Sequence, residues 1–192
     1  MFGWTDFLFL VVSLFIILPI VVFIRELGYF IAGVVVGAKN LRITIGSGPR
    51  LIKKGPLDIR RHYHLYSWFS YDRLEQQGKL AYVFLYASPI LINVLLGAGI
   101  ILLLDREVLP AFEEFWDRFL FYIFFYVLFD AVPMKMVYGR PNNGLILYEM
   151  LRYGKRVDTN KEPFLPSTSE IEEAYQKDMK ELQKELKEKH PK

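Results

Sequence analysis

The chain contains no cysteine, which excludes disulfide bonds, thiolate catalysis and thiolate metal sites. Charge is absent over long stretches, because residues 7–24 and residues 80–104 contain no Asp, Glu, Lys or Arg. The first six residues contain no Lys or Arg and no small-residue cleavage site follows, which argues against a signal peptide. Apolar residues are abundant instead: 53% of the 192 residues are hydrophobic and 16% are aromatic. This composition is typical of a membrane protein.

Three apolar stretches predict membrane spans, over about residues 7–38, 80–104 and 119–134. One span needs roughly 20 residues, so the first stretch must tilt, kink near Pro19 or continue beyond the lipid. The third stretch is short, rich in Phe and Tyr, and interrupted by Asp130. We therefore expect an all-α membrane protein with about three transmembrane helices.

Basic residues predict the orientation of these spans. The loop 39–79 carries nine Lys and Arg, whereas residues 105–118 carry two. The positive-inside rule then places this basic loop and the C-terminus in the cytoplasm and the N-terminus outside, in what we expect to be the cytoplasmic membrane of a prokaryote. Within the loop, "LRITIG" and "LDIRRHYHLYSWFS" alternate as strands do, which predicts a small β-element at the membrane surface.

The C-terminal part divides into two regions. Up to residue 160 the chain reads as the membrane core, in which Asn142 or Asn143 can cap a helix that ends before Gly154. Residues 161–192 read as a linker and a charged amphipathic helix. A capping box at Ser167–Glu170 precedes that helix. Its apolar stripe consists of Ile171, Tyr175, Met179, Leu182 and Leu186. We expect this tail helix to pack on the cytoplasmic face or on another helix.

Arg25 and Glu26 lie within the first apolar stretch, in the sequence "RELGYF". Charged residues at membrane depth are costly and mark functional positions. The segment also has the spacing of His-Glu-x-x-His, in which two His bind zinc and the Glu activates a water. Only Glu26 of that motif is present.

Further segments follow in a characteristic order: "VVVGAKNLRITIGSGPRLIKK", then "ASPILINVLL", then "DAVPMKMVYGRPNNGLILYEML". Together with "RELGYF" they resemble the site-2-protease family of intramembrane zinc metalloproteases, over roughly residues 20–154. The resemblance implies that Arg25, Tyr29 and Asn143 stand where that family has its zinc ligands, and Glu26 where it has its catalytic base. Asp130 replaces an Asn of the family. Ser88, Pro89 and Asn93 correspond to its Gly-Pro…Asn patch, with Ser88 in place of the Gly and Asn93 one residue later, and we expect them to pack helices together.

None of the three implied ligand positions carries a good zinc ligand. Arg25 has no lone pair to donate, Tyr29 would have to ionise, and Asn143 offers only a neutral carbonyl. We therefore expect no zinc, no other cofactor and no proteolysis, that is, a pseudoprotease. We also expect a buried polar network of Arg25, Glu26, Asp130 and Asn143, in which the Arg25 guanidinium supplies the positive charge of the missing metal.

Blander interpretations remain open at this stage. Arg25–Glu26 could be an interfacial break between two helices, Asn143 only an N-cap, and Ser88 and Asn93 only interhelical hydrogen-bonding residues. The basic loop does not indicate nucleic-acid binding, because topology and anionic lipid explain its charges. The expected partner is a membrane protein or peptide, held in the groove that relatives use for substrate. Two alternatives are an active peptidase using His62, His64 and Glu26, and a purely structural subunit of a membrane complex.

Overall fold

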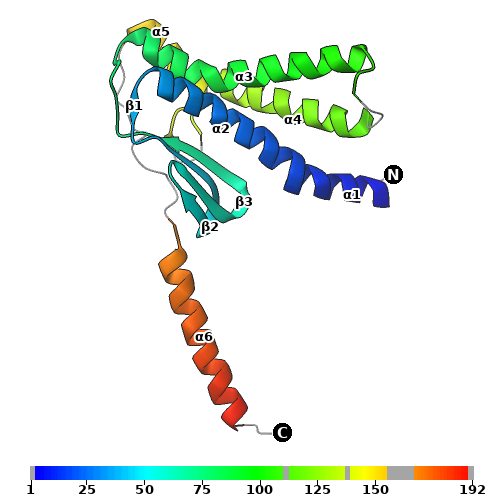
Figure 1. Cartoon of the computed structure of the whole chain (residues 1–192), viewed down its shortest axis with the longest axis vertical. Coiled ribbons are helices and arrows are strands. Elements are labelled where there is room, and N and C mark those ends of the chain that lie inside the picture. Colours follow the sequence, from blue (N-terminus) through cyan, green and yellow to red (C-terminus); the bar gives the residue numbers. More distant parts are fainter. Residues whose placement is uncertain (1–2, 110–112, 137–138, 155–166, 190–192) are drawn as a thin grey trace.

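The computed structural model describes residues 3–109, 113–136, 139–154 and 167–189. Three segments form one long N-terminal rod: α1 (Trp4–Val12), the π-helical turn η1 (Ser13–Ile17) and α2 (Leu18–Val35). Two more helices, α3 (Lys79–Asp105) and α4 (Glu113–Ala131), run antiparallel to each other beside it (Figure 1). The short α5 (Asn143–Tyr153) lies at the end where α2 finishes, and α6 (Ser169–Lys189) extends away beyond the strands.

Two antiparallel sheets interrupt the helices between α2 and α3. The first pairs β1 (Ala38–Lys39) with β4 (Arg73–Leu74), and the second pairs β2 (Arg42–Lys54) with β3 (Leu57–Ser70). Residues 43–45 of β2 pair with both ends of β3, at residues 57–59 and 67–69, so the hairpin curls around itself. The bend falls at Gly46, which has a φ of +89° and lies against the Tyr63 backbone, a conformation that favours glycine.

The all-α, three-span prediction is wrong. Among the described helices, only Trp4–Val35 and Lys79–Asp105 are long and apolar enough to cross a membrane. The predicted third span coincides with α4, whose sequence includes four charged residues in its first turns and Asp130 near its end. The strands are where the alternation predicted them, yet they are longer than a minor surface element and make the fold mixed α and β.

The hairpin runs alongside the first helical rod. Pro19 has no N–H to donate to the Phe15 carbonyl four residues earlier, and the hydroxyl of Tyr63 on β3 donates to that oxygen at 3.3 Å. The ring of His64 lies 4.8 Å from the ring of Phe15. The hairpin is therefore docked against η1, where the helix departs from α geometry, as well as against the end of α2.

Small residues set the packing of α2 on α3. A Cβ at Gly28 would lie 3.0 Å from the Pro89 Cα and 3.1 Å from the Ser88 carbonyl oxygen, so only glycine allows this approach. Pro89 leaves the Leu85 carbonyl without its helical donor, and the Ser88 hydroxyl donates to that oxygen at 2.8 Å. Ser88 and Pro89 thus lie at the α2–α3 contact, while Asn93 is buried one turn further along α3.

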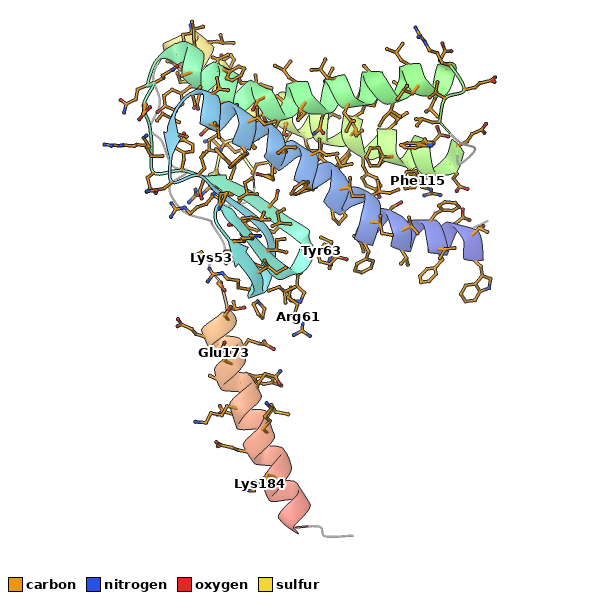
Figure 2. The ribbon with its side chains drawn as sticks, in the orientation of Figure 1. Lys53, Arg61, Tyr63, Phe115, Glu173 and Lys184 are labelled. Atoms are coloured by element: carbon orange, nitrogen blue, oxygen red, sulfur yellow. The ribbon has the colours of Figure 1, made fainter. Side chains whose placement is uncertain are left out.

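Two hydrophobic clusters hold the elements together. One joins α2 and the sheet to α3 and α5 and includes Tyr29, Phe69 and Met150. The other joins the first rod to α3 and α4 and includes Ile17, Ile100 and Ile123. Figure 2 shows Phe115, which packs against this second cluster, at the start of α4 beside α1.

The tail helix begins at the hairpin. The Ser169 hydroxyl accepts a hydrogen bond from the Arg50 backbone N–H at 2.8 Å, and Arg61 lies 3.6 Å from Glu172. Figure 2 shows Lys53 and Arg61 on the hairpin next to the first turns of α6, which carry Glu173. Arg50 also donates to Asp58 at 2.9 Å, and this hydrogen bond raises the pKa of Arg50. Residues 155–166, which include the start of the predicted linker at residue 161, and the side chains of Leu182 and Leu186 lie outside the described part of the chain.

Candidate functional site: a guanidinium between two carboxylates

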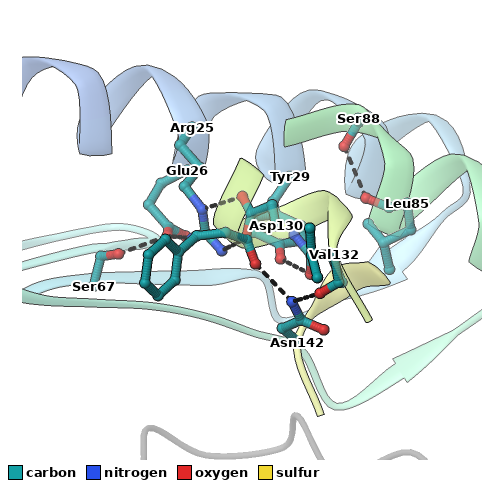
Figure 3. A network of polar contacts seen from close by, with 11 residues as sticks. Arg25, Glu26, Tyr29, Ser67, Leu85, Ser88, Asp130, Val132 and Asn142 are labelled. Atoms are coloured by element: carbon teal, nitrogen blue, oxygen red, sulfur yellow. Dashed lines mark hydrogen bonds and ion pairs between the residues drawn. The ribbon is translucent and has the colours of Figure 1, made fainter. Parts of the chain in front are cut away.

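The central feature of the site is the side chain of Arg25 on α2. Its Nε and Nη2 donate to the two carboxylate oxygens of Asp130 on α4 at 2.6 and 2.7 Å, a bidentate pair. Its Nη1 donates to Glu26 Oε1 at 2.7 Å. Glu26 is completely buried and Asp130 is 5% exposed, so the guanidinium neutralises charge that water does not reach (Figure 3). One cation therefore holds two carboxylates from two helices.

A residue of β3 also binds Glu26. The Ser67 hydroxyl donates to Glu26 Oε1 at 2.8 Å, so this oxygen accepts two hydrogen bonds (Figure 3). Ser67 was not among the predicted site residues. Its alternation with neighbours on the strand places it on one face, but the bulges that set the β2–β3 register are not readable from the sequence.

A second pair of polar residues lies beside the first. The Tyr29 hydroxyl on α2 donates to Asn143 Oδ1 at the start of α5, and both side chains are buried. The Arg25 guanidinium lies over the Tyr29 ring, 5.3 Å from its centroid, and the other contacts of that ring include Phe69 at 5.0 Å. Asn143 is therefore joined to the network through Tyr29, whose hydroxyl donates to its Oδ1.

Asn142 caps α5 and also ties it to α4. Its Oδ1 accepts hydrogen bonds from the backbone N–H groups of Leu145 and Met134, both at 3.0 Å. Its Nδ2 donates to the carbonyl oxygens of Phe129 and Val132, both at 2.6 Å. The cap was predicted from the sequence. The hydrogen bonds of Asn142 to the end of α4 were not predicted, because they depend on how that end approaches α5.

The network forms one wall of a cavity of about 570 Å³. Of the predicted site residues, Arg25, Glu26, Tyr29, Asp130 and Asn143 all line it. Ser88, Pro89 and Asn93 do not line it. Ser88 and Pro89 lie at the α2–α3 contact, and Asn93 is buried one turn further along α3. The opposite wall is formed by β3, which contributes Tyr63, Tyr66 and Trp68, and by Arg140, whose guanidinium lies 5.0 Å from the Trp68 ring centroid. These aromatic residues were not predicted as site residues.

The two histidines of the alternative peptidase are separated. His64 lines the cavity, whereas His62 is exposed and lies against Gly48 on the hairpin. Within the described residues, no group of three or more His, Asp or Glu is close enough to hold a metal ion.

The donor set does not suit the zinc ion that the family resemblance implies. The position that the resemblance assigns to the first ligand carries a guanidinium, which has no lone pair and repels a cation. Asn143 Oδ1 already accepts the Tyr29 hydroxyl hydrogen, and Glu26 Oε1 already accepts from Arg25 and Ser67. A zinc site needs three good protein ligands, and these residues do not supply them.

Comparison with known proteins gives one significant relative. Over 161 residues the chain is 30% identical to the "Uncharacterized membrane protein YwmF" of Bacillus subtilis (strain 168). The alignment covers 84% of this chain and all of that protein. No protein-family model matches the chain, and no solved structure matches it.

Proposed function

The chain belongs to the family of the Bacillus subtilis membrane protein YwmF, and from this premise we propose that it is a pseudoprotease that binds a membrane-protein partner. In this proposal the protein descends from the site-2-protease-like fold and has lost its metal and its hydrolytic activity. The cavity beside the former active site remains and serves recognition of the partner. The chain then acts as a regulator or accessory subunit of a membrane complex.

One observation carries the proposal: the Arg25 guanidinium binds both Glu26 and Asp130 at hydrogen-bonding distance in a buried site. A Glu can act as a general base only if it is free to take a proton from an activated water. Here one oxygen of Glu26 is bound by Arg25 and Ser67. This arrangement supports the proposal of a binding cavity in place of a hydrolytic site.

We further propose that the protein is a multi-pass protein of a prokaryotic cytoplasmic membrane, with the hairpin and α6 on the cytoplasmic side. The nine basic residues between Lys39 and Lys79 support this orientation through the positive-inside rule. The N-terminal end of α1 lies at the opposite end of the rod from β1, which supports an external N-terminus (Figure 1). The tail helix α6 begins at the hairpin, where the Ser169 hydroxyl accepts a hydrogen bond from the Arg50 N–H, and this supports a cytoplasmic position for α6.

The proposal is tested by purifying the chain in a mild detergent and identifying what co-purifies. We expect a membrane protein in stoichiometric amount and no cleavage of that partner on incubation with added zinc. A matched preparation lacking residues 161–192 separates a contact made by the tail helix from one made by the core. Zinc-dependent cleavage would favour the peptidase alternative. If the chain purifies from native membranes without any partner, the proposed binding function is contradicted.

A further inference from the structure

Apolar side chains are exposed at the ends of the two candidate membrane spans that flank the sheet. The first span ends with Val34 and Val35, which are 56% and 61% exposed. Near the start of the second span, Leu80 is 82% exposed. The chain becomes basic immediately beyond these residues, at Lys39 after the first span and at Lys79 before Leu80. A change from exposed apolar to basic side chains at the ends of two spans is typical of the boundary between a bilayer and water.

The short helix α5 lies at this same end of the molecule, beside the first turns of α3 (Figure 1). One of its faces packs into the core through Ile146 and Met150, which are both buried. The opposite face presents Tyr148, Leu151 and Arg152, which share one side of the helix because they are spaced by three and four residues. Tyr148 is 44% exposed and Leu151 is 61% exposed. A face of tyrosine, leucine and arginine is typical of a helix that lies in the membrane interface.

Two cations lie at the edge of this face. The Lys79 Nζ donates to the Leu151 carbonyl oxygen at 3.1 Å, which places the ammonium group of α3 beside the last turn of α5. The Arg152 Nη1 donates to the Tyr148 hydroxyl at 2.6 Å, and the guanidinium lies 5.6 Å from the Tyr153 ring centroid. A lysine carries three hydrogen-bond donors and an arginine five, so both residues keep donors for a further acceptor.

We propose that an anionic phospholipid binds at the boundary surface, which consists of Lys79, Leu80, Tyr148, Leu151 and Arg152. Its phosphate accepts hydrogen bonds from Lys79 and Arg152, and its acyl chains lie against Leu80 and Leu151. Glu149, the one acidic residue of α5, is only partly exposed, so the surface is net positive and matches a negative headgroup. The surface also continues the exposed apolar ends of the two spans, which favours lipid as the ligand. This inference goes beyond the proposed function and depends neither on the partner nor on the cavity.

Fluorescence quenching in vesicles tests the inference on the full chain. Because the chain has no cysteine, Leu151→Cys provides a single site for an environment-sensitive fluorophore. The labelled chain is placed in phosphatidylcholine vesicles that contain phosphatidylglycerol or phosphatidylcholine with a nitroxide quencher near the headgroup. We expect quenching by both lipids, with phosphatidylglycerol effective at a mole fraction lower by about fivefold or more, since each basic residue near an anionic surface strengthens binding about fivefold. A label at Lys177→Cys on α6 is the matched control and should not be quenched.

Two pairs of substitutions connect the lipid preference to the boundary surface. Lys79→Gln together with Arg152→Gln removes both cations, and the labelled chain should then be quenched about equally by the two lipids. Lys180→Gln together with Lys184→Gln removes the same charge from α6 and should leave the preference unchanged. All four side chains are exposed, so these variants should fold like the unmodified chain.

The inference is overturned if neither lipid quenches the label at residue 151, because that face would then meet water or protein. Equal quenching of the labels at residues 151 and 177 would also overturn it, since α5 would then have no special depth. So would a preference for phosphatidylglycerol that is absent from the start or that survives the loss of Lys79 and Arg152. None of these results bears on the proposed function, which fails instead on zinc-dependent cleavage or on the absence of a co-purifying partner.

Discussion

At the scale of single residues, Arg25 decides the chemistry of the site. It is positioned by its place on α2, directly before a completely buried Glu26 and opposite Asp130 on α4. The sequence suggested this grouping because opposite charges occur in two apolar stretches, where each needs a partner. It could not suggest Ser67, Trp68 or the second role of Asn142. Those depend on the curl of the hairpin and on the end of α4.

Removing the positive charge should destabilise the protein strongly. Arg25→Met leaves Glu26 and Asp130 buried without a counter-charge, and we expect a loss of about 3–5 kcal/mol in the free energy of unfolding. Lys39→Met is the control, because the Lys39–Glu75 pair is 50% and 56% exposed and an exposed pair contributes little to stability. Both are compared by denaturant unfolding in one detergent.

The charge explanation also predicts a rescue. Adding Glu26→Gln and Asp130→Asn to Arg25→Met removes the uncompensated carboxylates, so much of the lost stability should return. Equal stability of Arg25→Met and Lys39→Met would show that the guanidinium is not the counter-charge. Failure of the triple variant to recover would indicate that lost packing, and not charge, explains the effect.

At the scale of elements, sequence signals that act within one turn or one strand predicted the structure correctly. Features that depend on packing between distant segments were not predicted. Asn142 and Gly154 bound α5 as predicted, because a side-chain cap and a left-handed glycine act within one turn. The alternating sequence pattern correctly predicted strands in the regions of β2 and β3. The third span was wrong because an uncharged aromatic run was taken as a span, although α4 begins with acidic residues and contains Asp130. Aromatic residues occur in protein cores as well as on lipid-facing surfaces, so an aromatic run alone does not identify a membrane span.

The contact of α2 with α3 depends on Gly28. Gly28→Ala would place a Cβ 2.9 Å from the Ile92 Cγ2 and 3.0 Å from the Pro89 Cα, so we expect a loss of about 1–3 kcal/mol from overpacking. Gly99→Ala on α3 is the matched control, since nothing lies within 4 Å of that position. It should stabilise the helix by up to about 1 kcal/mol. Thermal unfolding of both variants checks the opposite signs, and a stable Gly28→Ala would contradict the close approach.

The double role of Asn142 predicts a graded series. Asn142→Ala removes all four hydrogen bonds, whereas Asn142→Asp keeps the acceptor for Leu145 and Met134 but turns a carboxylate oxygen toward the Phe129 and Val132 carbonyl oxygens. We expect a loss of about 2 kcal/mol or more for Ala and a larger loss for Asp, because a buried carboxylate is repelled by two carbonyl oxygens. Denaturant unfolding measures both. An Asp variant as stable as the unmodified chain would contradict the donor role of Asn142.

At the scale of the whole molecule, a membrane core and an exposed helix meet at the hairpin. The apolar clusters join the rod, the sheet and α3–α5, while α6 contacts mainly β2. Ile171 is 71% exposed and Tyr175 is 56% exposed, so the predicted stripe begins with residues that the core does not cover. The core should therefore fold without the tail.

Removal of residues 161–192 should barely change the stability of the core. The described contacts of α6 with the hairpin are few and lie at the surface, and surface ion pairs such as Arg61–Glu172 contribute little. We expect Tm to shift by less than about 4 °C, which corresponds to roughly 1 kcal/mol for a chain of this size. Differential scanning fluorimetry of both forms measures it, and a larger fall would assign α6 a structural role.

Zinc content before and after restoring the ligands tests most directly whether a guanidinium has replaced a metal ion. The experiment compares the unmodified chain with a variant carrying Arg25→His, Tyr29→His and Asn143→Asp, both dialysed against zinc and analysed by mass spectrometry. The account predicts a negligible zinc content for the unmodified chain and stoichiometric zinc for the triple variant. Stoichiometric zinc in the unmodified chain, or a folded triple variant that binds none, would contradict it.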